Sequence, residues 1–303
     1  MVHVVERDTM PRAVGLYARA LSPRPRPDVA KGLPDRVVRL VGHRSAVADV
    51  AAYDAVCGFV LTDRLPATWL HVLTFPLQLE LFCASDFPVA PTGMVHVGNT
   101  ITQHRPALVN EALALSVHAE DLRPHRRGVL FDIVGEASAG SELVWEGRST
   151  YLNRSAKLPG EADSGAAHQR GGSDTDIGVR TAPLDAEVPV LRPAGLWRLP
   201  ADLGRRYAAV SGDVNPIHLN PLVARAFGFP RMIAHGMWTH ARTLSALQPR
   251  LPDAFQVGVQ FSKPVLLPST VRFAAGETED GYAAQLTDRR AEKVFVTLTT
   301  TRR

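Results

Sequence analysis

Residues 65–82 read LPATWLHVLTFPLQLELF, and residues 229–247 read FPRMIAHGMWTHARTLSAL. Each stretch is apolar and long enough to form a helix that is buried against other elements. Both open with an apolar residue followed by proline, and this alignment places His71 opposite His235 and Val72 opposite Gly236. The sequence therefore predicts two copies of one structural unit.

The segments that follow the two predicted helices are also alike. Residues 101–108, ITQHRPAL, and residues 259–266, VQFSKPVL, both place a basic residue and a proline before an apolar pair. Strings rich in β-forming residues come next in each half, at residues 112–118, 128–134 and 143–152 and at residues 270–274, 282–287 and 293–300. A helix followed by a meander of antiparallel strands indicates an α+β fold and resembles the hotdog arrangement, in which a curved sheet wraps a helix.

A polar segment divides the chain into two parts of similar size. Residues 158–180 contain almost no large apolar side chains and are dense in glycine, serine, aspartate and alanine, which is typical of a linker. We therefore predict an N-terminal hotdog over residues 1–157 and a C-terminal hotdog over residues 181–303. Pairing of their exposed sheet edges gives a double hotdog with one continuous sheet.

Composition narrows the class of protein. Hydrophobic residues make up 45% of the chain, and no apolar run approaches the roughly 18 residues that cross a bilayer. The start of the chain lacks the apolar core of a secretory signal, so we expect a cytoplasmic protein without a membrane span. The net charge of +4 is small and the densest basic string, residues 123–127, holds no aromatic residue, so we expect no nucleic-acid partner. Cys57 and Cys83 lie in apolar strings and are predicted to be reduced core thiols.

The string that predicts function is YAAVSGDVNPIHLNP, residues 207–221. Gly212 and Pro216 indicate a tight loop that runs from Asp213 to His218. A carboxylate and an imidazole held close together on such a loop can both hydrogen-bond one water molecule, which is the arrangement that general acid–base catalysis needs.

An isolated Asp-x-Asn-Pro string is more often a turn or a helix cap than a functional site. The Asn-Pro pair at residues 220–221 has that role here, because it predicts the start of a short helix over residues 222–227 that Gly228 ends. The longer string differs because Tyr207 and His218 stand at fixed offsets from the Asp-x-Asn-Pro core.

The whole motif resembles the signature of the MaoC-like, or R-specific hydratase 2, family, which consists of tyrosine, small residues and Gly-Asp-x-Asn-Pro-x-His. It is matched at Tyr207, Gly212, Asp213, Asn215, Pro216 and His218. Family members of this length are double hotdogs with the signature only in the second unit. The first half here lacks the Asp-x-Asn-Pro-x-His string, so we expect one active site per chain beside a degenerate first copy that shapes the acyl tunnel.

The resemblance implies a hydro-lyase that reversibly hydrates trans-2-enoyl thioesters to (3R)-hydroxyacyl thioesters carried by CoA or by acyl carrier protein. Asp213 and His218 are the expected acid–base pair, and the backbone N–H of Gly236 is expected to bind the thioester oxygen. Asn215 is expected to orient the loop or the water, and His235 to contact substrate or pack beside it. The family also suggests a homodimer.

Two alternatives on the same fold are a thioesterase and a non-catalytic acyl-thioester-binding partner. His235 and His240 are five residues apart, a poor spacing for two metal ligands on one helix face. Neither Ser211 nor Ser245 lies in a nucleophile elbow, and no glycine-rich nucleotide loop is present. We therefore expect neither a metal nor a redox cofactor.

Overall fold

The computed structural model describes residues 2–21, 24–91, 93–158 and 190–303, and its strands form one eleven-stranded sheet in the order β1-β2-β4-β5-β6-β3-β8-β11-β10-β9-β7. The strands are β1 (His3–Arg7), β2 (Arg36–His43), β3 (Met94–Gln103), β4 (Leu113–His125), β5 (Gly128–Ala139), β6 (Glu142–Asn153), β7 (Arg192–Leu199), β8 (Phe255–Phe261), β9 (Ser269–Thr278), β10 (Gly281–Asp288) and β11 (Val294–Arg302). The helices are α1 (Ala13–Leu21), α2 (Val47–Cys57), α3 (Ala67–Phe82), α4 (Leu203–Ser211), α5 (Pro221–Ala226) and α6 (Gly236–Leu247), with 3-10 turns η1 (Val29–Lys31), η2 (Pro216–His218) and η3 (Gln248–Arg250).

The sheet contains the same strand order twice. In the first half the order is β2-β4-β5-β6-β3, and in the second half it is β7-β9-β10-β11-β8. The strand that follows the central helix of each half, β3 or β8, therefore lies at the centre of the whole sheet. There β3 and β8 pair antiparallel, with Asn99 opposite Val259. Strand β1 is an addition that pairs parallel to β2. The predicted α+β double hotdog is confirmed.

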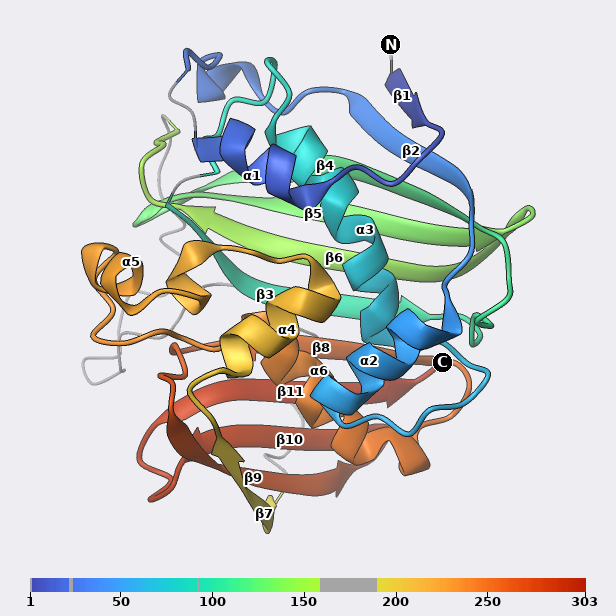
Figure 1. Cartoon of the computed structure of the whole chain (residues 1–303), viewed down its shortest axis with the longest axis vertical. Coiled ribbons are helices and arrows are strands. Elements are labelled where there is room, and N and C mark those ends of the chain that lie inside the picture. Colours follow the sequence, from blue (N-terminus) through green and yellow to red (C-terminus); the bar gives the residue numbers. More distant parts are fainter. Residues whose placement is uncertain (1, 22–23, 92, 159–189) are drawn as a thin grey trace.

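The helices lie on one side of this sheet, with α3 and α6 side by side near the centre (Figure 1). Helix α3 packs against β2 to β6 and is buried on nearly all sides, which explains why its sequence is apolar without an amphipathic period. Helix α6 packs on β10 and β11 and also touches α2 and α3. In the described part of the chain no helix is both long enough and apolar enough to cross a membrane.

Equivalent backbone hydrogen bonds fix how the two halves correspond. The N–H of Leu65 donates to the carbonyl of Ala107 at 2.8 Å, and the N–H of Ala234 donates to the carbonyl of Val265, also at 2.8 Å. These two bonds connect the chain just before each central helix to the segment after the next strand. They confirm the predicted match of residues 101–108 with residues 259–266.

The same correspondence corrects the alignment of the helices. Helix α3 begins at Ala67 and α6 begins at Gly236, so Ala67 stands where Gly236 stands. The match of His71 with His235 and of Val72 with Gly236 is wrong by five residues. The alignment matched Phe229-Pro230 with Leu65-Pro66, but residues 229–235 belong to a loop that precedes α6, whereas Leu65-Pro66 directly precedes α3.

The helix before each central helix, α2 or α4, shows the correspondence of the two halves more clearly. Residues 53–60 read YDAVCGFV and residues 207–214 read YAAVSGDV. Helices α2 and α4 end in the same way, because the C-cap residue of each is a left-handed glycine, Gly58 with φ 82° and Gly212 with φ 70°. Phe59 therefore stands where Asp213 stands, and the first copy has no carboxylate at this position.

Three smaller expectations concern local features. Cys57 and Cys83 are buried free thiols, as predicted. The short helix predicted over residues 222–227 is α5, displaced by one residue, and its start is capped by Asn220, whose side-chain oxygen accepts from the N–H of Leu222 at 2.8 Å. The predicted linker, residues 158–180, lies outside the described residues from position 159 onward.

Three histidines are enclosed near the contact between α3 and α6. His71 is 4% exposed and His240 is fully buried, with both ring nitrogens unpartnered among the described residues. His96, on β3, stacks 6.0 Å from His71. Burial lowers the pKa of His71 to about 4 and the pKa of His96 and of His240 to about 3, so all three rings are neutral at pH 7.

These histidines make stability depend on pH. Their pKa values in the folded chain lie below the unfolded value of about 6.5, so the unfolded chain binds protons that the folded chain cannot, and stability is lost as the pH falls below that value. His240→Leu should reduce the loss of unfolding free energy between pH 7 and pH 5 by on the order of 1 to 2 kcal/mol, as measured by urea unfolding. Replacing the exposed His104 by leucine is the matched control, and equal pH dependence in both variants would refute the assignment.

Candidate active site

The residues of the motif lie on a loop whose shape is set by its own hydrogen bonds. Gly212 turns the chain out of α4, and the N–H of Asn215 then donates to Asp213 Oδ1 at 3.2 Å. The Oδ1 of Asn215 accepts from the N–H of Ile217 at 3.4 Å and caps η2, which ends at His218. The sequence thus folds locally so that Asp213 and His218 face the same side of the loop.

The ring of His218 is held in one tautomer. Its Nδ1 lies 2.8 Å from the backbone oxygen of Ile233, and because a carbonyl can only accept, Nδ1 carries the proton. Burial lowers the pKa of His218 to about 3, so the ring is neutral at physiological pH. The Nε2 atom therefore presents a lone pair and can accept a proton.

His235 packs directly on this ring and connects the loop to α6. The two rings are stacked with centroids 3.7 Å apart, and His235 Nε2 donates to the backbone oxygen of Asp213 at 3.0 Å. The same nitrogen lies 3.8 Å from Asp213 Oδ2. Tyr207, the first residue of the motif, packs 4.9 Å away against His235. The structure thus brings His235 to the loop, where it positions the backbone of Asp213.

Asp213 remains a carboxylate although its side chain is only 25% exposed. Burial alone would raise its pKa, but the imidazoles of His235 and His218 and hydrogen bonds from Tyr17 and Asn215 outweigh burial and hold the pKa of Asp213 below its usual range. At neutral pH the loop therefore offers a negative oxygen beside an unprotonated imidazole nitrogen.

Tyr17 was absent from the residues predicted from sequence. Its hydroxyl donates to Asp213 Oδ1 across 196 positions of the chain. The contact could not be predicted because α1 precedes the repeated unit and no local pattern connects residue 17 to the motif.

Gly236 is the first residue of α6, as predicted, and its surroundings explain the need for glycine. A side chain there would meet the ring of Phe261, whose nearest atoms lie 3.3 Å from the position of a Cβ. The first N–H groups of a helix have no partner within that helix and carry partial positive charge. The backbone of Gly236 is therefore suited to bind an oxygen that develops negative charge.

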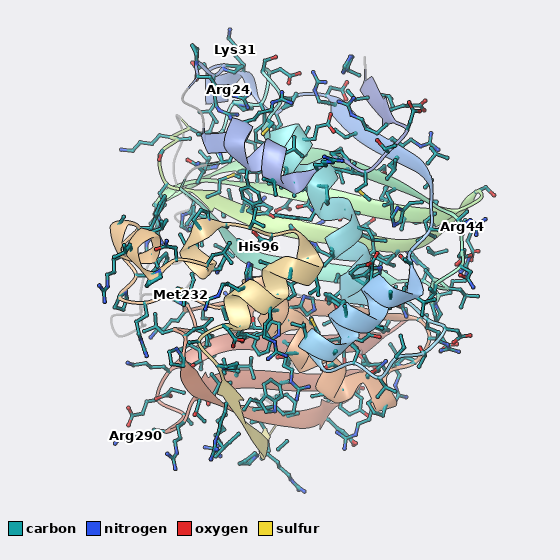
Figure 2. All side chains as sticks on the ribbon, in the orientation of Figure 1. Arg24, Lys31, Arg44, His96, Met232 and Arg290 are labelled. Carbon is teal, nitrogen blue, oxygen red and sulfur yellow. The ribbon has the colours of Figure 1, made fainter. Side chains whose placement is uncertain are left out.

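Side chains from the first half enclose the site. His96 stacks on Tyr151 at 4.7 Å and meets Phe261 edge-on at 5.2 Å. The hydroxyl of Tyr151 donates to Gln78 on α3 at 3.2 Å. Figure 2 shows His96 near the middle of the molecule, close to the junction of the two halves. Burial lowers the pKa of His71, and the negative charge of Asp213 offsets part of this effect.

Asp213, His218 and His235 also have the composition of a metal site. Each presents a ligand atom, and these atoms lie within 4.8 Å of one another. Two of the four imidazole nitrogens already donate to backbone carbonyls. That the site works without a metal stays a prediction, and treatment with a chelator tests it.

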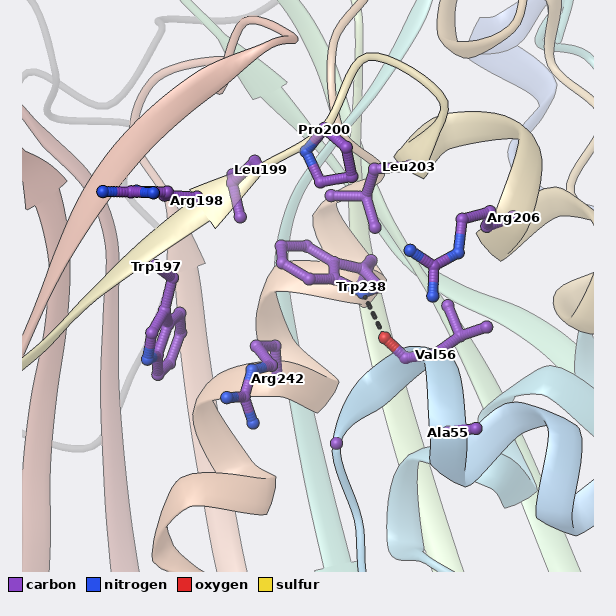
Figure 3. A pocket seen from close by; sticks show the side chains of 11 residues that line it. Ala55, Val56, Trp197, Arg198, Leu199, Pro200, Leu203, Arg206, Trp238 and Arg242 are labelled. Carbon is purple, nitrogen blue, oxygen red and sulfur yellow. Dashed lines mark hydrogen bonds between the residues drawn. The ribbon is translucent and has the colours of Figure 1, made fainter.

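A cavity of about 360 Å³ lies apart from this loop, between the C-terminal end of α2 and β7, α4 and α6 (Figure 3). Trp238 forms one wall and donates its Nε1 hydrogen to the backbone oxygen of Val56 at 3.0 Å. The guanidinium of Arg242 lies over the ring of Trp197 at 4.5 Å. Asp213, His218 and His235 do not line this cavity, so it is separate from the candidate site.

Fold and site together define a double hotdog with an acid–base loop in its second half, and comparisons with known proteins agree. A family model described as a MaoC like domain matches residues 183–299. The chain is 40% identical to 3-hydroxyacyl-thioester dehydratase X of Mycobacterium tuberculosis over 94% of each chain. It is 37% identical to the enoyl-CoA hydratase ChsH3 of the same organism over 37% of this chain and 34% of that one. The crystal structure of HtdX of Mycobacterium tuberculosis superposes with a TM-score of 0.73, at 36% identity, covering 88% of this chain and 100% of that chain.

The chain belongs to the MaoC-like dehydratase family and is a hydro-lyase.

The two asparagine caps of the loop region allow a matched test of the geometry. Asn215→Ala should lower the free energy of unfolding by about 1 kcal/mol through loss of the cap. It should also lower turnover by roughly tenfold or more, because the loop that carries Asp213 and His218 loses the Asn215 side-chain hydrogen bond that shapes it. Asn220→Ala removes the cap of α5 and should give a similar loss of stability with turnover near that of the wild type. Equal activity losses in the two variants would contradict a special role for Asn215.

Proposed function

We propose that the chain catalyses the reversible addition of water to trans-2-enoyl thioesters to give (3R)-3-hydroxyacyl thioesters. The observation that carries the proposal is the pairing of the Asp213 carboxylate with a neutral His218 whose Nε2 is unprotonated, on one rigid loop. Its similarity to a 3-hydroxyacyl-thioester dehydratase and to an enoyl-CoA hydratase supports this chemistry.

In the hydration direction, both groups accept hydrogen bonds from one water molecule. As the water oxygen attacks C3, one of the pair takes a proton from the water and the thioester carbonyl becomes enolate-like. The proton then passes to C2, so the elements of water are added and the enzyme returns to its starting state. Dehydration follows the same steps in reverse.

The developing charge on the thioester oxygen needs a donor that is already in place. The N–H of Gly236 at the start of α6 supplies it, with the partial charge of the helix end in the same direction. Both groups of the pair lie on one loop, so we expect them to deliver water to one face of the double bond. Delivery to one face would give a single configuration at C3, and the family resemblance favours R.

CoA is the carrier that we propose first, with acyl carrier protein as the second possibility. One active site per chain follows from the presence of Phe59 where the second half has Asp213. A homodimer of such chains is the assembly that we propose.

Asp213→Asn and His218→Gln each keep the shape of the side chain and remove its acid–base capacity. Either change should lower turnover of crotonyl-CoA by about 100-fold or more while the far-ultraviolet circular dichroism and the melting temperature stay close to the wild type. The assay is the loss of enoyl absorbance. Near-normal turnover in a folded variant would remove that residue from the proposed pair.

The same assay separates the alternatives. A thioesterase would release a free thiol, which a thiol reagent detects, and a binding protein would leave both signals unchanged. We expect loss of the enoyl band without thiol release. Prior dialysis against a chelator should leave the rate unchanged; a loss that zinc restores would assign Asp213, His218 and His235 to a metal centre.

Gly236→Val tests the proposed oxygen-binding position. The branched side chain would meet the ring of Phe261 and crowd the oxygen bound by the backbone N–H. We expect turnover to fall by roughly 100-fold with a smaller relative loss of stability. The matched control is Ala67→Val, at the equivalent position of α3, where no thioester is proposed to bind. A purely structural effect of equal size in both variants would argue against this role for Gly236.

A further inference from the structure

Helix α1 lies outside the repeated unit, which begins at β2, yet it reaches the loop of the second half. Tyr17 on this helix donates its hydroxyl hydrogen to Asp213 Oδ1, and its ring packs against Phe75 of α3 at 6.4 Å. Leu16, the neighbouring residue, is 7% exposed and docks the helix in the core. The first half therefore contributes a polar group to the second half's site through an element that the hotdog repeat does not require.

The two oxygens of Asp213 have different surroundings. Oδ1 accepts two hydrogen bonds, one from the hydroxyl of Tyr17 and one from the N–H of Asn215. Oδ2 lies 3.8 Å from His235 Nε2, whose hydrogen is directed to the backbone oxygen of Asp213. Oδ2 therefore keeps its lone pairs for another donor.

We propose that Tyr17 is a positioning residue, whose hydroxyl holds Asp213 Oδ1 so that Oδ2 is the oxygen that meets the reacting water. This inference rests on the proposed hydratase function. It also gives the N-terminal helix a role, since among the described residues of the hotdog units the Asn215 N–H is the one donor to that oxygen.

The hydroxyl is suited to this role at every working pH. Burial, together with the charge of Asp213, raises the pKa of Tyr17 far above its ordinary value, so the group remains a neutral donor. The other titratable groups that act on Asp213 are His235 and His218 on its own side of the site, Tyr207 on α4, and His71, His96 and Tyr151 from the first half. None of these is altered when the Tyr17 hydroxyl alone is removed.

The test is Tyr17→Phe, which keeps the ring against Phe75 and deletes the hydroxyl. We expect kcat for crotonyl-CoA to fall about tenfold with KM within about twofold of the wild type, because the group orients a reacting residue without touching substrate. Loss of a hydrogen bond to the charged form should move the acid limb of the pH–kcat/KM profile upward by about one unit. A carbon-13 titration of the Asp213 carboxyl, assigned by its disappearance in Asp213→Asn, should show the same upward shift.

Two controls separate the hydroxyl from general packing. Leu16→Ala loosens the docking of α1 without removing the donor, and Tyr53→Phe deletes another buried hydroxyl, which donates to Thr68 at 2.9 Å. Both should leave the carboxyl titration unchanged. An unchanged acid limb and titration in Tyr17→Phe, or an equal shift in Leu16→Ala, would overturn the proposal. An inactive wild-type protein would instead refute the hydratase function, while the carboxyl titration would still decide the role of Tyr17.

Discussion

The antiparallel pairing of β3 with β8 is the contact on which the rest of the molecule depends. It joins two five-stranded units into one sheet and covers the edge strand, β3 or β8, that each unit would otherwise expose there. It also sets α3 beside α6 on the same side of that sheet. The loop of the second half then has a wall built from residues of the first half, His96 on β3 among them. Separating the units would leave the loop without that enclosure.

Enclosure explains the ionisation states of the site. A buried imidazole is easier to keep neutral than charged, so His218 presents a base instead of a cation. A buried carboxylate needs donors, and Asn215 of the loop and Tyr17 of α1 supply them. The two groups of the proposed pair are thus held in the forms that hydration requires before substrate arrives. The same burial is the reason that we expect the fold to lose stability in acid.

The two halves show how a repeat becomes asymmetric. Helices α2 and α4 share the pattern Tyr-x-Ala-Val-x-Gly at their C-terminal ends, and each ends on a left-handed glycine, but Phe59 follows in one and Asp213 in the other. The connection to the central helix is short in the first half, residues 59–66 before α3, and long in the second, residues 213–235 before α6. The longer connection contains η2 and α5 and therefore His218. Loss of the carboxylate and absence of this loop together leave the first copy as a wall of the site.

The sequence predicted the double hotdog, the long strands that follow each central helix, and the loop from Asp213 to His218, because these depend on local periodicity, on proline and glycine, and on a motif of fixed spacing. It placed the repeat wrongly at the central helices, since a matching Phe-Pro pair outweighed the register that only backbone hydrogen bonds reveal. Tyr17 was missed because its contact with Asp213 depends on tertiary packing alone.

The stereochemistry of hydration tests the central claim most directly. Crotonyl-CoA is incubated with the protein in deuterium oxide, and the 3-hydroxybutyryl-CoA product is analysed by chiral chromatography and proton NMR. Because one loop holds the water and returns its proton to the same face, we expect a single deuterium at C2 added syn to the hydroxyl, in the (3R) product that we propose. A (3S) product, or deuterium distributed over both faces of C2, would contradict it.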